Sequence, residues 1–406
     1  MMATRRAAAR VTWIVALALI VGCTRTEAEP LPSLTPLVPA DELPTATAVT
    51  TTSIVRSSPP DDPILDAMPD VPCGFADLAA ATADGSLTEI TFVVGDRLFG
   101  SSPDGTAVRC LAELSRDQRG AVSWSPPGDR VLLAGGTVLD AAGARRSGFE
   151  VGSTRVRWEA DGNGLVSPNS SGSSVVRRSS TAADDRTTIA FLSRTWALAA
   201  HPAGAGVVVA AGVADDGRRG LAARVAADRP PVPLLTLLNP DEQITELAID
   251  DAGDVVYFIT DNGVQFRVHR LALAMLTTSE LDVEQAPIAQ LVVGPAWRTV
   301  AWRVGLCNDD TETVVRDDRS GNVMQVGDDT PLEGLSLSPV GWLDAARLVV
   351  ASRTLGCDGP ADVWIWNLLD GSATLLVKTV EMPATRTVPQ PSGPLAIDPA
   401  AVAPGL

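Results

Sequence analysis

The sequence has few of the residues from which recognisable catalytic or metal centres are built. It contains two histidines, His201 and His269, and no HExxH or GxSxG motif, which excludes a histidine-rich metal centre and two common hydrolase signatures. No two of its five cysteines have CxxC spacing, so zinc or thiol-redox sites of that type are excluded as well. We therefore expect no motif-based catalytic residues, no metal and no cofactor.

Positive charge is also scarce. The chain has 32 Lys and Arg against 49 Asp and Glu, a formal net charge of −17. Three arginines and no acid lie in residues 1–22, so the remainder has 29 bases against 49 acids, or −20. A surface this acidic repels nucleic acid. We expect no nucleic-acid partner.

No apolar run has the roughly 20 residues that a transmembrane helix needs. The run at residues 11–21 has 11, and it follows the basic segment MMATRRAAAR, as in a signal peptide. It ends in Ile20-Val21-Gly22-Cys23, which resembles the bacterial lipobox, where the cysteine is lipidated and becomes the new N-terminus. We predict a lipoprotein signal peptide over residues 1–22 and lipidation of Cys23. An ordinary secretory signal or an uncleaved anchor helix is the alternative.

The next segment has the composition of a tether. Residues 24–72 contain ten prolines, the run TATAVTTTS and few large apolar side chains, so they bury too little surface to offset their chain entropy. We predict that residues 23–72 are a lipidated cysteine followed by a disordered linker. The linker would span roughly 40 Å as a coil and at most about 150 Å as polyproline II. The protein is then expected outside the cytoplasm, anchored to the cell membrane.

From Cys73 onward, short β-branched runs alternate with turn residues, which predicts an all-β domain over residues 73–406. One unit recurs: an apolar strand, a polar or proline step, a short turn and a second apolar strand. The copies are aligned on Ser125, Glu159, His201, Asp250, Gly294 and Ser338, which are 34, 42, 49, 44 and 44 residues apart. A period near 40–50 indicates the blades of a β-propeller.

The two ends of this domain look complementary. Residues 90–111 resemble a blade that lacks its innermost strand, and residues 394–399 resemble an innermost strand without a blade. We therefore predict a single propeller closed by the C-terminal strand at 394–399, with seven blades, or six because one unit is degenerate.

The turn from Ser125 to Asp129 reads Ser-Pro-Pro-Gly-Asp and is followed by an apolar strand. It resembles the TolB-type, WD40-like propeller repeat, and Ser338-Pro339 looks like a partial second copy. The resemblance implies a propeller and a role in protein contacts of the cell envelope. It carries over no functional residue.

Setting Cys23 apart leaves four cysteines, the even number expected of disulfides in an exported protein. Cys307 and Cys357 each follow the second strand of neighbouring units, so we expect them to form a disulfide bond. Cys73 then pairs with Cys110 by elimination. Each bridge would add about 2–4 kcal/mol of stability.

Other residues have competing interpretations. Trp124 and Trp158 occupy one slot in consecutive units, which favours packing between blades over a sugar-stacking platform. His201 is expected to be a surface turn residue. The acidic run at residues 308–312 lacks the alternating pattern of a calcium loop and is interpreted as a solvated loop.

The favoured function is a monomeric, non-enzymatic module that binds or scaffolds an envelope protein, peptide or glycan. The alternative is a hydrolase or lyase that uses carboxylates at the channel mouth, because such pairs leave no linear motif. A third hypothesis is a propeller that senses or stabilises a neighbouring membrane protein.

Lipidation makes a direct prediction. The natively expressed protein should partition into Triton X-114 and carry a diacylglyceryl mass increment, because its acyl chains are buried by detergent. A Cys23→Ala variant should stay in the aqueous phase without added mass. Equal partitioning of the two proteins, with no lipid mass on either, would contradict the assignment.

Overall fold

The computed structural model describes Cys73 and residues 90–385, apart from 106–107, 120–121, 135, 141–142, 147–155, 181–185, 191, 203, 205–206, 225–228, 296–298, 307–310, 319, 328–329 and 354–359. These residues form 27 strands and one 3-10 helix at Arg116–Gln118. None of their helices is long and apolar enough to cross a membrane. The predicted signal peptide, Cys23 and the tether lie outside the described residues.

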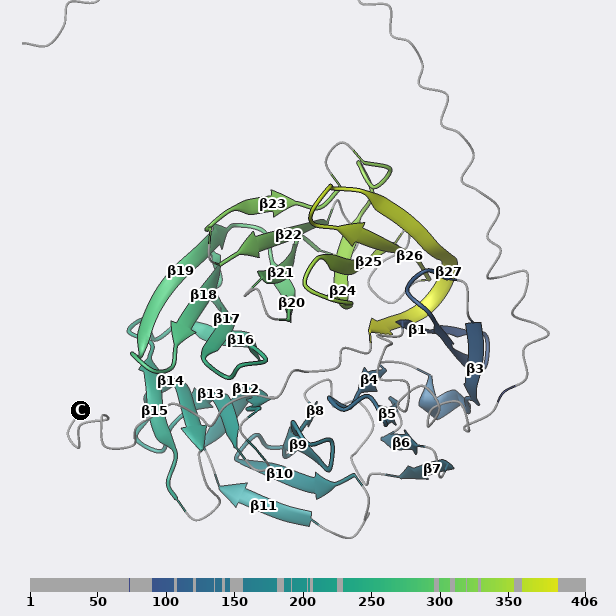
Figure 1. The fold of residues 1–406 in the computed structure, drawn as a ribbon. Coiled ribbons are helices and arrows are strands. Elements are labelled where there is room, and N and C mark those ends of the chain that lie inside the picture. The colour runs from purple at the N-terminus through teal and green to yellow at the C-terminus, as the bar shows by residue number, and fades with distance from the viewer. Residues whose placement is uncertain are drawn as a thin grey trace, which may run out of the picture. The chain divides into compact units, whose positions relative to one another are not determined.

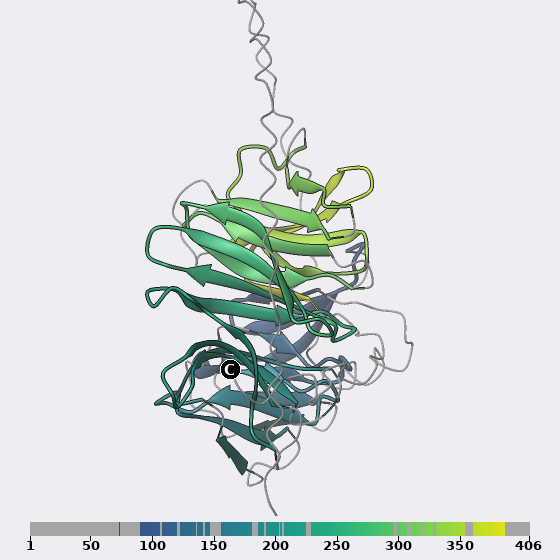
Figure 2. The same cartoon turned by 90° about the vertical axis from the view of Figure 1, so that its left-hand side faces the viewer.

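Most strands belong to five separate sheets, each made of four consecutive antiparallel strands. Figure 1 shows these sheets following one another around a centre, and Figure 2 shows them from the side, one above another. The sheets are β4 (Ser123–Trp124), β5 (Val131–Leu132), β6 (Thr137–Asp140) and β7 (Gly143–Arg146); β8 (Arg157–Trp158), β9 (Gly164–Pro168), β10 (Ser174–Ser179) and β11 (Arg186–Ala190); β12 (Arg194–Ala200), β13 (Val208–Val213), β14 (Arg219–Arg224) and β15 (Val232–Thr236); β16 (Gln243–Ile249), β17 (Val255–Asp261), β18 (Phe266–Ala272) and β19 (Thr277–Glu284); and β20 (Ile288–Val293), β21 (Thr299–Val304), β22 (Glu312–Asp317) and β23 (Val323–Gln325).

The remaining strands share one seven-stranded sheet, in the order β24-β25-β26-β27-β1-β2-β3. Its strands are β24 (Leu337–Trp342), β25 (Arg347–Arg353), β26 (Ala361–Asn367), β27 (Ala373–Thr385), β1 (Ile90–Val94), β2 (Arg97–Ser101) and β3 (Val108–Glu113). The chain is thus an all-β propeller with five separate blades, and not the seven separate blades that we expected. The reason is β27, which is continuous over 13 residues and joins what would otherwise be two blades.

Strand β27 also closes the ring. Its first part pairs with β26, and its last part pairs antiparallel with β1, with Thr385 opposite Ile90 and Glu381 opposite Val93. The other side of β1 is taken by β2. Residues 381–385 thus occupy the edge of β1 that we expected residues 394–399 to fill. Residues 394–399 lie outside the described part of the chain.

The apolar core lies between neighbouring sheets. Ala199 and Leu221 of one sheet pack in the same cluster as Leu247 of the next, and Tyr257 packs in the same cluster as Trp302. A blade therefore buries both faces, and all six residues from Val255 to Thr260 are buried. This double burial explains why the second strands read as continuous apolar runs instead of alternating ones.

One repeat unit has a different register from the one that the sequence indicated. Ser338 and Pro339 lie inside β24, and the turn begins at Leu343, whose N–H donates to Arg347 O at 2.9 Å. The same bond starts the turn at Ser125, whose N–H donates to Arg130 O. Leu343 is therefore the counterpart of Ser125, and the alignment on Ser338 is wrong. A β-bulge between Pro339 and Gly341 hides the strand alternation there.

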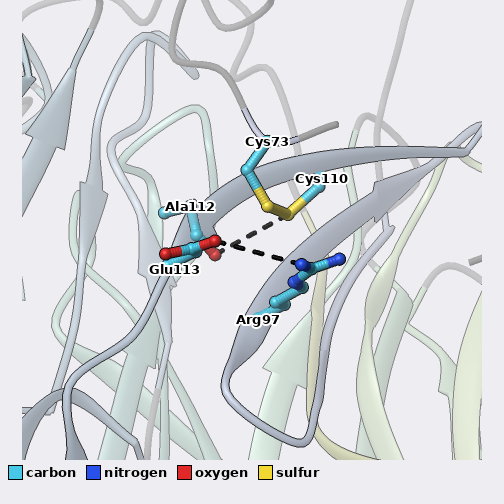
Figure 3. Close-up of a disulfide and its surroundings, with 5 residues drawn as sticks. All are labelled: Cys73, Arg97, Cys110, Ala112 and Glu113. Carbon is cyan, nitrogen blue, oxygen red and sulfur yellow. Dashed lines mark hydrogen bonds and ion pairs between the residues drawn. A yellow bond between two sulfur atoms is a disulfide. The ribbon is translucent and has the colours of Figure 1, made fainter. Parts of the chain in front are cut away.

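The Cys73–Cys110 disulfide is present, as predicted. Cys110 is buried in β3, next to the exposed ion pair of Arg97 and Glu113 (Figure 3). The bridge joins the segment before β1 to the third strand of that group, 37 residues away. Cys307 and Cys357 lie outside the described residues, so their pairing stays a prediction.

The bridge should contribute measurably to stability. A double variant, Cys73→Ala with Cys110→Ala, should lose about 2–4 kcal/mol of the free energy of unfolding, because the unfolded chain has more conformational entropy without the bridge. Urea unfolding under non-reducing conditions measures this loss. Cys23→Ala is the matched control and should unfold like the wild type; a double variant as stable as that control would contradict the prediction.

Candidate functional site

A cavity of about 310 Å³ opens where the first strands of the five separate blades end. Each blade contributes the last residue of its first strand and the turn residue two positions later. The strand residues are Trp124, Trp158, Ala200, Ile249 and Val293, and the turn residues are Pro126, Ala160, Pro202, Asp251 and Pro295. Because corresponding positions from successive blades meet there, the cavity is the mouth of the central channel on this face. We call it the channel mouth.

Two tryptophans form part of its wall. Their indole N–H groups donate to the preceding blade, Trp124 to Thr91 Oγ1 at 3.1 Å and Trp158 to Ser123 O at 3.2 Å. Both rings are buried, so they pack between blades, as predicted. Trp342 occupies the same slot and donates to Val292 O at 3.4 Å. Sequence reasoning missed it because the last unit was aligned on Ser338.

The residue after each of these strands is a buried polar side chain in four blades. These residues are Ser125, Glu159, His201 and Asp250. Asp250 Oδ1 accepts from the N–H groups of Asp254 and Val255, at 2.8 and 2.9 Å. Glu159 instead accepts two bonds from the Arg177 guanidinium, at 2.7 and 2.8 Å. In each of these two blades, the bonds of the carboxylate hold the turn that borders the channel mouth.

His201 is not the surface residue that we expected, because its exposed fraction is 0%. Its Nε2 lies 2.8 Å from Gly253 O of the next blade and donates a hydrogen bond to it. A Cβ at Gly253 would lie 2.5 Å from His201 Cε1, so the ring needs glycine there. Burial lowers the pKa of His201, against the opposing effects of the Gly253 bond and Asp254. The imidazole is therefore neutral at pH 7 and joins two blades.

The Glu246 carboxylate, like His201, joins two blades. Glu246 of β16 accepts hydrogen bonds from the N–H groups of Gln290 and Leu291, at 2.8 and 2.9 Å. A bulge in β20 removes those two residues from its pairing with β21. Burial raises the pKa of Glu246, although the Leu291 bond and the Arg157 charge oppose it. The side chain also lines a cavity of about 220 Å³ that Arg353 shares.

These carboxylates serve structural roles. Asp250 and Glu246 each accept two backbone N–H bonds, whereas a general acid or base must exchange a proton with substrate. Among the described residues, no three His, Cys, Asp or Glu side chains are grouped to hold a metal ion. Of the acidic run, residues 308–310 lie outside the described part; Thr311 is buried and Glu312 begins β22.

No protein-family model and no curated protein matches the chain. Among solved structures, an oligogalacturonate lyase in complex with manganese is 13% identical with a TM-score of 0.50, covering 69% of this chain and 82% of that one. A putative TolB from Agrobacterium tumefaciens is 11% identical with a TM-score of 0.44, covering 74% and 97%. TolB from Acinetobacter baumannii is 12% identical with a TM-score of 0.42, covering 76% and 85%. At this identity the likeness to the lyase concerns the fold alone, which is that of a β-propeller protein.

Stability should depend on pH through His201. Its folded-state pKa lies below the unfolded value of about 6.5, so the unfolded chain binds more protons as the pH falls below that value, and stability is lost. His201→Gln retains an N–H donor for Gly253 O but does not titrate. Urea unfolding at about pH 7.5 and 5.5 should show a smaller loss for the variant than for wild type.

The second histidine provides an internal comparison. His269 Nε2 lies 3.0 Å from Thr260 Oγ1, and burial lowers its pKa as well. A residual pH dependence in His201→Gln is therefore expected and should shrink further in the double variant with His269→Gln. Equal losses in wild type and His201→Gln would refute the assignment.

Proposed function

We propose that this chain is an exported lipoprotein, held to the membrane through a lipid on Cys23, whose propeller binds a protein or peptide of the cell envelope. Residues 24–72 then serve as the tether that separates an acidic domain from the bilayer. The propeller acts as a monomer. We further infer that its seven-stranded sheet fills two positions of a seven-bladed ring, since residues 381–385 lie beside β1 as an innermost strand would.

The channel mouth is the observation that supports a binding role. Its lining combines two tryptophans, three prolines and the apolar side chains of Ile249 and Val293 with the carboxylates of Asp250 and Asp251. Its volume is near the lower end of the range for ligand sites. An apolar side chain next to a basic one in a bound peptide would match this lining. The carboxylates of the lining would attract the basic residue.

A catalytic role has weaker support. The alternative of a hydrolase or lyase needs a pair of carboxylates that can act as acid and base. Asp250 lines the channel mouth and Glu246 lines the cavity that Arg353 shares, and both hold the backbone of a turn or a bulge. We therefore favour binding over catalysis.

A site-specific photocrosslink tests the proposal. A benzoylphenylalanine at Ala160, which lines the channel mouth, should capture a discrete partner on intact cells. The matched control carries the same group at Thr278, an exposed position on the outermost strand β19, and should not capture that partner. Identical products from both positions, or no product from Ala160, would argue against a binding role for this face.

A further inference from the structure

We propose that a second cavity, at the opposite end of the same strands, binds a saccharide unit. This cavity, of about 320 Å³, lies between the β9–β10 turn at residues 169–172, the start of β12 at 194–196 and the start of β16 at 243–245. Strands β12 and β16 begin here and end at the channel mouth. The site is therefore separate from the one proposed above, and it requires neither the lipid nor an envelope protein.

The lining of this cavity is polar but carries no negative charge. Eight of its ten residues have side chains that donate or accept hydrogen bonds, namely Asn169, Ser170, Ser171, Arg194, Thr195, Trp196, Gln243 and Thr245. None is Asp or Glu, although the chain has 49 of these. Ligand pockets are usually lined by apolar groups, so this lining selects a ligand rich in hydroxyls. Each hydroxyl can donate and accept, as amides and hydroxyls of the wall require.

Trp196 supplies the apolar surface that sugar recognition also needs. It lies at a register shift of β12 between Thr195 and Ala197, where a bulge redirects the side chain. The ring packs partly on the neighbouring core cluster, and the Arg219 guanidinium lies 5.8 Å from its centroid, so its orientation is fixed. The part of the indole that lines the cavity gives the C–H groups of a pyranose an apolar contact.

The walls are held in place before any ligand arrives. Asn169 Oδ1 accepts from Ser171 Oγ at 3.2 Å and from the Ser174 N–H at 3.3 Å, which fixes the turn. Gly172 has φ +74° and its carbonyl accepts from the Thr195 N–H at 2.7 Å, which ties the turn to β12. A cavity with a fixed shape loses less conformational entropy when it binds.

One lining group still lacks a partner. The Thr195 side chain is 2% exposed, and its Oγ1 has no hydrogen-bond partner in the described part of the protein. A buried hydroxyl without a partner destabilises the folded protein. Thr195 lines the cavity, so a sugar hydroxyl bound there can supply the missing partner. This is an independent observation in favour of a polar ligand.

The test is calorimetric titration of the purified full-length protein with trisaccharides of glucose, mannose, galactose, N-acetylglucosamine and galacturonate. We expect at least one to bind, with an affinity that Trp196→Ala lowers at least tenfold. Gln243→Ala, at an exposed position, should lower it severalfold. Asp251→Asn, at the channel mouth, is the matched control and should bind like wild type.

A variant of Arg194 distinguishes an anionic sugar ligand from a neutral one. If the natural ligand is a uronate, Arg194→Ala should abolish binding of the galacturonate trimer; if it is neutral, the variant should retain most of its affinity. If Trp196→Ala does not fold, Trp196→Phe and Gln243→Ala provide the test. Binding of none of the five sugars by folded wild type, or binding that neither variant weakens, would overturn the proposal. Failure of the lipidation test or of the photocrosslink at the channel mouth would not contradict this proposal.

Discussion

The pairing of the last part of β27 with β1 is the interaction on which the rest of this structure depends. A blade is stable only when both of its faces are covered, because its strands are apolar on both sides. In an open array the two terminal sheets would each expose a face, and β1 would expose an unpaired edge. Placing Thr385 opposite Ile90 removes that edge and covers these faces at once. The ring is therefore cooperative, and its closing contact is also among the most distant in sequence.

Closure brings the first strands together, and their ends define two surfaces of different chemistry. At one end, tryptophans and prolines form the apolar channel mouth. At the other, amides and hydroxyls surround Trp196. Both depend on the same blade-to-blade bonds, such as those of His201 to Gly253 and of Glu246 to Gln290. A substitution that breaks one contact between blades should therefore alter the shape of both surfaces.

The disulfide places a covalent attachment at the third strand of the group β1–β3. Cys73, which precedes β1, is bonded to Cys110 in β3, 37 residues away. The strand that closes the ring, β1, is held instead by its pairing with β27 and β2.

The sequence by itself determined the all-β class, the repeat period and the packing role of Trp124 and Trp158, because each leaves a local pattern of residue type or spacing. The Cys73–Cys110 pair followed by elimination from the number of cysteines. Only the tertiary structure decided which strand closes the ring, since residues 381–385 and 394–399 are both extended-looking segments and the choice lies in the pairing of distant edges. The same holds for His201, whose burial depends on Gly253 in another blade. It holds too for the bulges in β12, β20 and β24, which shift register without a residue signature. Both cavities escaped prediction for this reason: their walls come from several blades, and no stretch of sequence contains them.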